Sequence, residues 1–86
     1  DNKAVEVILR FSVKRIPYIL TKPLHGVSQR LDKTDPENRT IILNLLPNKE
    51  MYQTLLSFGS DVEVLSPPLV VNKIKNISEK MNEYYN

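Results

Sequence analysis

Few residues of this 86-residue chain could take part in chemistry. His25 is the only histidine and cysteine is absent, so no pattern of metal ligands can be assembled around it. The serines lack the G-x-S-x-G context of an activated nucleophile. Asp61 and Glu63 flank one residue beside a predicted turn, where two carboxylates are typically solvated surface groups and not an acid–base pair. We therefore expect no metal, no cofactor and no enzymatic activity.

The run GVSQR at residues 26–30 resembles the phosphate-binding segment of acylphosphatases, which reads Gly-Val-x-aromatic-Arg. Gln29 stands at the aromatic position. The run also follows the first predicted helix instead of preceding it, so Arg30 would not meet the helix N-terminus that such anion sites use. An acyl-phosphate hydrolase is therefore disfavoured.

Composition indicates one small domain over residues 1–86, with 41% hydrophobic residues. Charged residues make up 26% and the net charge is +2, which gives electrostatic binding of nucleic acid little support. No apolar run approaches the ~20 residues of a membrane span, and no signal-peptide pattern is present. The absence of cysteine suits a cytoplasmic protein. The chain opens without Met, so we expect it to be a piece of a longer protein.

Periodicity predicts the first half of the fold. Residues 5–11 alternate as a strand does. Residues 13–22 are predicted to form a helix with Ser12 as its N-cap, although Pro17 would delay its start. A weak strand follows at 26–31, then a turn at Asp35-Pro36, then a strong strand at 40–46. The expected apolar side of the helix is Ile16, Ile19 and Leu20.

Turn chemistry organises the second half. Asn48 is the predicted N-cap of a helix that ends at Gly59, a C′ residue in the left-handed region. A strand is predicted at 62–65. Ser66 is then expected to cap a terminal helix over 67–84, with Pro67 at its first position. The apolar stripe of that helix is Val70, Ile74, Ile77, Met81 and Tyr84.

The order of elements predicts an α+β fold, the ferredoxin-like βαββαβ sandwich, with an added C-terminal helix. Four antiparallel strands would carry two helices on one face, with the first and third strands in the centre. The residues expected to face the helices are Val5, Val7, Leu9, Phe11, Ile41, Leu43, Leu45, Val62 and Val64.

The other face of the sheet supplies the candidate ligand or interface residues. They are Ile8, Ile42, Arg10 and Asn44, and the register of the second strand decides whether Arg30 or Gln29 joins them. His25 is a further candidate, and its alternative role is that of a polar turn residue or a structural histidine. No aromatic residue lies among the strand positions, which disfavours stacking on RNA bases. In the alternative interpretation the arginines pair with Glu6 and Glu63, or the terminal helix covers this face.

Several segments together resemble the C-terminal extension (WCX) domain of bacterial WYL-domain transcriptional regulators. They are VILRFS at 7–12, PLHGVSQRL at 23–31, TIILNLL at 40–46 and LLSFGSDVEVLSPP at 55–68. The last run is the most specific part. The loop DKTDPENR at 32–39 departs from the glycine-containing hairpin of the family.

The resemblance implies a ferredoxin-like module that follows a helix-turn-helix domain and a WYL domain, neither of which has its signature in these residues. It implies a role in dimerisation and in transmitting the state of a nucleotide or nucleic-acid effector. The expected partners are the WYL domain of the same or a sister chain and a second copy. The alternative is a free-standing ferredoxin-like domain that senses a small molecule.

Overall fold

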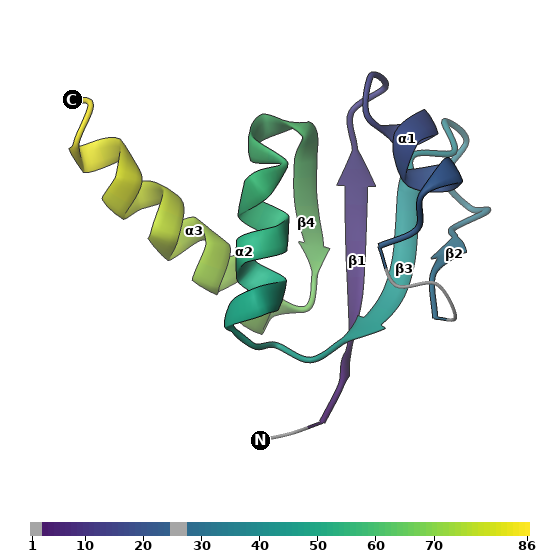
Figure 1. The fold of residues 1–86 in the computed structure, drawn as a ribbon, viewed down its shortest axis with the longest axis horizontal. Helices are drawn as coiled ribbons and strands as arrows, with labels where there is room; N and C mark the ends of the chain where they lie inside the picture. The colour runs from purple at the N-terminus through teal and green to yellow at the C-terminus, as the bar shows by residue number, and fades with distance from the viewer. Residues whose placement is uncertain (1–2, 25–27) are drawn as a thin grey trace.

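The computed structural model describes residues 3–24 and 28–86. Within these ranges the chain forms four strands, three α-helices and one short 3-10 helix, η1 (Figure 1). In chain order they are β1 (Val5–Phe11), α1 (Ile16–Thr21), β2 (Arg30–Leu31), β3 (Thr40–Leu45), α2 (Lys49–Ser57), η1 (Gly59–Asp61), β4 (Val62–Ser66) and α3 (Pro68–Glu83).

The strands form one antiparallel sheet in the order β2-β3-β1-β4, so the predicted central pair is confirmed. Both α1 and α2 lie on one face of this sheet (Figure 1). The fold is therefore the predicted ferredoxin-like sandwich with an added C-terminal helix. No helix within the described part of the chain is long and apolar enough to cross a membrane.

The core lies between the sheet and the helices. Its fully buried strand residues are Val7, Leu9, Phe11, Ile41 and Leu43. The other predicted positions, Val5, Leu45, Val62 and Val64, are partly buried against them. The predicted register is thus confirmed, because alternation alone decides which side of each strand faces the helices.

The first helix is shorter than predicted. Pro17 lies in its first turn, and the helix begins at Ile16. Ser12 caps the preceding turn instead, where its Oγ accepts a hydrogen bond from the Arg15 N–H at 3.1 Å. The assignment of Leu20 to the buried side was wrong, since this side chain is 48% exposed. With six residues, α1 has fewer than two turns, and the residues that it buries are Ile16 and Ile19.

The second strand is also shorter than predicted. Only Arg30–Leu31 pair with β3, and Ser28 lies in a turn. Residues 26 and 27 of the predicted strand lie outside the described residues. β3 ends at Leu45, one residue before the predicted end.

Both residues that were predicted to mark the ends of α2 are confirmed. The Asn48 side chain accepts a hydrogen bond from the Met51 N–H at 2.9 Å, which satisfies one free donor of the first turn. Gly59 has φ +56°, a conformation that glycine adopts without a Cβ penalty. It opens η1, which turns the chain into β4.

The terminal helix begins one residue later than predicted. Ser66 is still part of β4, Pro67 takes the N-cap position, and Pro68 is the first helical residue. Because proline has no side-chain hydrogen-bond acceptor, α3 has no side-chain cap.

The predicted stripe of α3 divides into two parts. Val70 is fully buried and Ile74 packs against the core. Farther along, Met81 is 50% exposed and Tyr84 is 84% exposed. The helix therefore projects away from the body of the domain (Figure 1).

Candidate functional site

The face of the sheet opposite the helices, here called the open face, contains most of the candidate residues. Ile8 in β1 lies opposite Ile42 in β3, and Arg30 in β2 lies on the other side of Ile42. These three residues form a row across three strands. The same face carries four more residues, because side chains two positions apart in a strand point to the same side of the sheet and paired residues share a side. They are Glu6, Arg10, Asn44 and Glu63. The two isoleucines are half-buried, so the row has an apolar centre and a charged end.

The register of β2 places Arg30, and not Gln29, on the open face. The Gln29 carboxamide turns toward α1, where it accepts a hydrogen bond from the Leu24 N–H at 2.7 Å and donates one to the Ile19 carbonyl at 3.3 Å. Gln29 therefore joins the end of α1 to the sheet. His25 lies outside the described residues.

Arg30 pairs with Glu6 across the open face. Its Nη2 lies 3.2 Å from Glu6 Oε2, and the two side chains are 56% and 55% exposed. An exposed ion pair of this kind contributes little to stability. The guanidinium could therefore turn toward an anionic group of a partner at small cost.

Arg10 is more constrained, because Glu37 holds it. The Glu37 Oε1 accepts hydrogen bonds from Arg10 Nη2 at 2.7 Å and from Arg39 Nη2 and Nε at 2.6 and 3.1 Å. The Arg39 and Arg10 guanidiniums hold the pKa of Glu37 below its usual range, and the hydrogen bond to Glu37 raises the pKa of Arg10. The Arg10 Nε is buried without a hydrogen-bond partner. Arg10 is thus directed toward the loop at residues 32–39, with 40% of its side chain exposed.

The Asp35 carboxylate organises the part of the 32–39 loop that carries Glu37. Asp35 accepts hydrogen bonds from the backbone N–H groups of Glu37 and Arg39 and from the Thr40 hydroxyl, at 2.9, 3.0 and 2.8 Å. The hydrogen bond from the Glu37 N–H is the largest cause that lowers the pKa of Asp35 to about 2. Asn38 supplies the left-handed residue of this glycine-free loop, with φ +56°.

Arg39 anchors the same loop to the sheet by donating to the Phe11 carbonyl at 2.8 Å. Sequence reasoning missed Glu37 and Arg39, because the loop has no periodicity from which their partners could be inferred. The only available signal was the acidic and basic composition of residues 32–39.

The charges on the open face nearly balance. Arg10 lies close to the carboxylates of Asp35, Glu37 and Glu63, and Arg39 pairs with Glu37, so this end of the face is not cationic. The other end has the Arg30–Glu6 pair beside Asn44. Such a surface suits a partner with apolar and hydrogen-bonding groups better than an extended run of phosphates.

Of the alternative interpretations, one is confirmed in part and one is wrong. Arg30 does pair with Glu6, but the ion-pair partner of Arg10 is Glu37 and not Glu63. The terminal helix does not cover the open face. Val70 and Ile74 belong to the core on the helix side, where the Lys73 ammonium lies 6.0 Å from the centre of the Tyr52 ring in α2.

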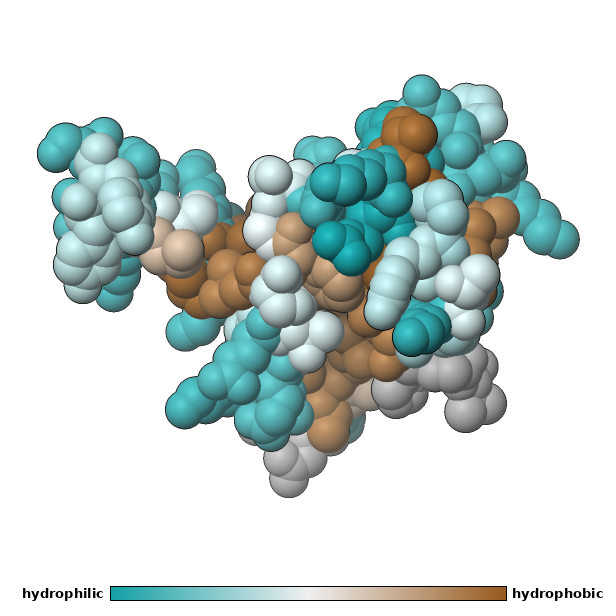
Figure 2. Space-filling model, turned by 45° about the horizontal axis from the view of Figure 1, so that its top comes forward, coloured by the Kyte–Doolittle hydropathy of each residue, from teal (hydrophilic) through white to brown (hydrophobic). Residues whose placement is uncertain are grey.

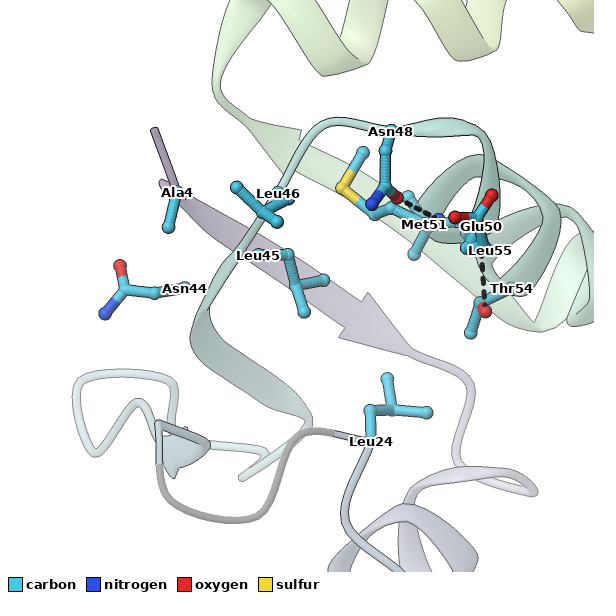
Figure 3. A pocket seen from close by; sticks show the side chains of 10 residues that line it. All are labelled: Ala4, Leu24, Asn44, Leu45, Leu46, Asn48, Glu50, Met51, Thr54 and Leu55. Atoms are coloured by element: carbon cyan, nitrogen blue, oxygen red, sulfur yellow. Dashed lines mark hydrogen bonds between the residues drawn. The ribbon is translucent and has the colours of Figure 1, made fainter. Parts of the chain in front are cut away.

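A hollow of about 430 Å³ lies between Leu24, which follows α1, the end of β3 and α2 (Figure 3). Leu24, Leu45, Leu46, Met51 and Leu55 supply its apolar lining. Its polar groups are largely engaged, since Asn48 caps α2 and the Thr54 hydroxyl donates to the Glu50 carbonyl. Ligand sites typically have several converging polar groups, so the hollow is a weaker candidate than the open face.

Within the described ranges, no group of three or more His, Cys, Asp or Glu side chains could hold a metal ion. The sequence model of the WCX domain family matches residues 3–81. A search of curated proteins gave no match. Because the matched span runs from the residues before β1 into the last turn of α3, the chain belongs to the WCX domain family.

Proposed function

We propose that this chain is a non-catalytic regulatory and assembly module of a WYL-type transcriptional regulator. The observation that carries the proposal is the WCX match over residues 3–81, because the family implies that regulatory context. In this function the WYL domain of the same or a sister chain packs on the module. The module helps to transmit the binding of a nucleotide or nucleic-acid effector to the DNA-binding part of a cytoplasmic homodimer.

The open face is the proposed contact surface for signal transmission. Its half-buried pair of Ile8 and Ile42 offers apolar area to a partner, and the exposed Arg30 offers a planar fork of donors to a carboxylate or phosphate. The loop fixed by Asp35 holds Arg10 in a defined position beside them. A surface held in this way can transmit a shift in a partner more directly than a mobile one.

The test uses the intact regulator and short single-stranded DNA or a nucleotide as the effector. We expect Arg30→Ala to weaken effector-dependent operator binding several-fold, and Arg10→Ala to weaken it at least as much. Lys14→Ala is the matched control, because it removes the same charge from an exposed turn between β1 and α1. Thermal unfolding of the isolated chain would reveal any loss of fold. Unchanged effector responses in both arginine variants would remove the open face from the signalling path.

The hollow beside α2 favours a second candidate function, a free-standing domain that senses a small apolar molecule. A thermal-shift screen of the chain with small apolar molecules, including amino acids with apolar side chains, distinguishes the two functions. A ligand whose stabilising effect is lost in Leu46→Ala, with no WYL domain present, would favour the sensor, because Leu46 lines the hollow and is 45% exposed.

A further inference from the structure

We infer that the groove between α2 and α3 is a binding site for a small organic carboxylate with an apolar body, such as a medium-chain fatty acid. The groove has a volume of about 650 Å³, within the range typical of ligand pockets. It is lined by a different side of α2 from the hollow, and no open-face residue lines it. The inference therefore goes beyond the proposed function and does not rest on it.

The walls of the groove are apolar and come from two helices. Tyr52 and Leu56 line it from α2, and Leu69 and Ile77 line it from α3. Leu69 is 62% exposed, so this wall offers apolar area that the domain itself leaves in water. Figure 2 shows apolar surface where α3 leaves the body of the domain. Such walls suit a ligand with an apolar body, because removing apolar area from water favours binding.

The charged groups of the groove are all positive. Lys49 and Lys73 line it, and none of its nine described lining residues is Asp or Glu. The Lys73 ammonium lies 6.0 Å from the centre of the Tyr52 ring, so one cation is held beside the wall. Within the described ranges, neither lysine forms an ion pair. The groove thus carries two cations without a counter-charge, and an anionic group complements them.

Two neutral polar side chains of the groove also have no partner. Among the described residues, neither the Tyr52 hydroxyl nor the Gln53 carboxamide forms a hydrogen bond. Burial raises the pKa of Tyr52, so its hydroxyl is a donor at neutral pH. In the hollow, by contrast, Asn48 and Thr54 are already engaged. Free donors suit the oxygens of a carboxylate, which only accept hydrogen bonds.

The lining favours one carboxylate over a nucleotide. No arginine is among the described lining residues, so a phosphate would meet point charges and no planar fork of donors. Tyr52 is the one aromatic residue in this lining. It packs against the core and has Lys73 beside its ring, which leaves little of the ring for a base to stack on. An aliphatic chain needs only the leucine and isoleucine walls.

The first experiment measures the binding of octanoate to the chain by isothermal titration calorimetry at neutral pH and low salt. We expect saturable binding that is several-fold weaker in Lys49→Gln and in Lys73→Gln, because each substitution removes one ammonium from the groove. Lys75→Gln is the matched control, since it removes the same charge from an exposed position about 200° around α3 from Lys73. Absence of saturable binding, or equal weakening in all three variants, overturns the inference.

Three further ligands test the chemistry of the site in the same titration. Octanol has the same chain without the charge, acetate has the charge without the chain, and AMP has a phosphate and a base. We expect each of them to bind several-fold more weakly than octanoate. If any of the three binds as tightly as octanoate, the carboxylate and the chain do not act together, and the inference is overturned.

The second experiment locates the ligand by NMR of the methyl-labelled chain. We expect nuclear Overhauser contacts from octanoate to the methyl groups of Leu69 and Ile77, which line the groove. Amide hydrogen exchange near Ile77 should slow on binding, because the ligand contacts α2 and α3 together. Contacts with Leu24 and Leu46 in their place would put octanoate in the hollow and overturn the inference.

Discussion

Leu43 and Ile42 are neighbours in β3, but they belong to two different surfaces of the molecule. Leu43 is fully buried among the aliphatic residues between the sheet and the helices. Ile42 is half-buried on the open face, between Arg30 and Ile8. The covered face holds the fold together by apolar burial. The open face combines a small apolar centre with ion pairs, which is a composition typical of contacts that form and separate.

The largest effect should come from the covered face. Leu43→Ala removes buried methyl groups and leaves a cavity, so we expect the free energy of unfolding to fall by about 2–5 kcal/mol. Urea denaturation measures this loss. Because a domain of this size has little stability to spare, part of the population should be unfolded at 37 °C. A loss below 1 kcal/mol would mean that the core can collapse around the cavity.

The second-largest loss of stability should come from a substitution in the loop at residues 32–39, at the corner of the open face, and this loss should depend on pH. The pKa of Asp35 lies at about 2 in the folded state, below its ordinary value of 3.8. The carboxylate therefore stabilises the fold above pH ~4, and this contribution is lost as the pH falls toward 2. We expect Asp35→Asn to lower the melting temperature at pH 7.

The difference in melting temperature between wild type and Asp35→Asn should shrink as the pH falls from 5 to 2. A difference that stays constant over this range would show that the substitution acts through shape and not through the charge of the carboxylate.

Ile42→Ala tests the difference between the open and the covered face within a single strand. Its side chain is only half-buried, so we expect a loss of about 1 kcal/mol, well below that of Leu43→Ala. The same urea titration measures both variants. Equal losses would indicate that another part of the intact chain covers the open face in solution.

The smallest effect should come from the exposed ion pair. A double-mutant cycle on Arg30→Ala and Glu6→Ala should give a coupling below about 1 kcal/mol, and it should weaken with salt. A larger coupling would mean that the pair is more enclosed than its exposure indicates. It would also weaken the proposal that Arg30 is available to a partner.

The sequence was sufficient where a local rule decides the structure. Alternation in residues 5–11 and 40–46 predicted which side chains enter the core, and Asn48 and Gly59 marked the ends of α2. It was insufficient for β2, because two paired residues contain no alternation. Whether Arg30 or Gln29 faces outward could then be read only from the register with β3.

The candidate site was predicted less completely than the fold. Ile8, Ile42 and Arg10 were expected on the open face, but the hydrogen bond between Arg10 and Glu37 joins groups 27 residues apart in sequence. No local pattern contains such a pairing. In the same way, the stripe of α3 shows which side of the helix is apolar, but it does not show where the rest of the domain ends.

The position of β1 has a consequence for the order in which the chain can fold. β1 is synthesised before the other strands of the sheet, but its two neighbours are β3 and β4, and Phe11 pairs with Val62, roughly 50 residues later. During synthesis the central strand therefore keeps one unpaired edge until β4 has left the ribosome. A nascent chain that stalls within α2 would expose this edge, and neighbouring nascent chains could pair with it before the native strand arrives.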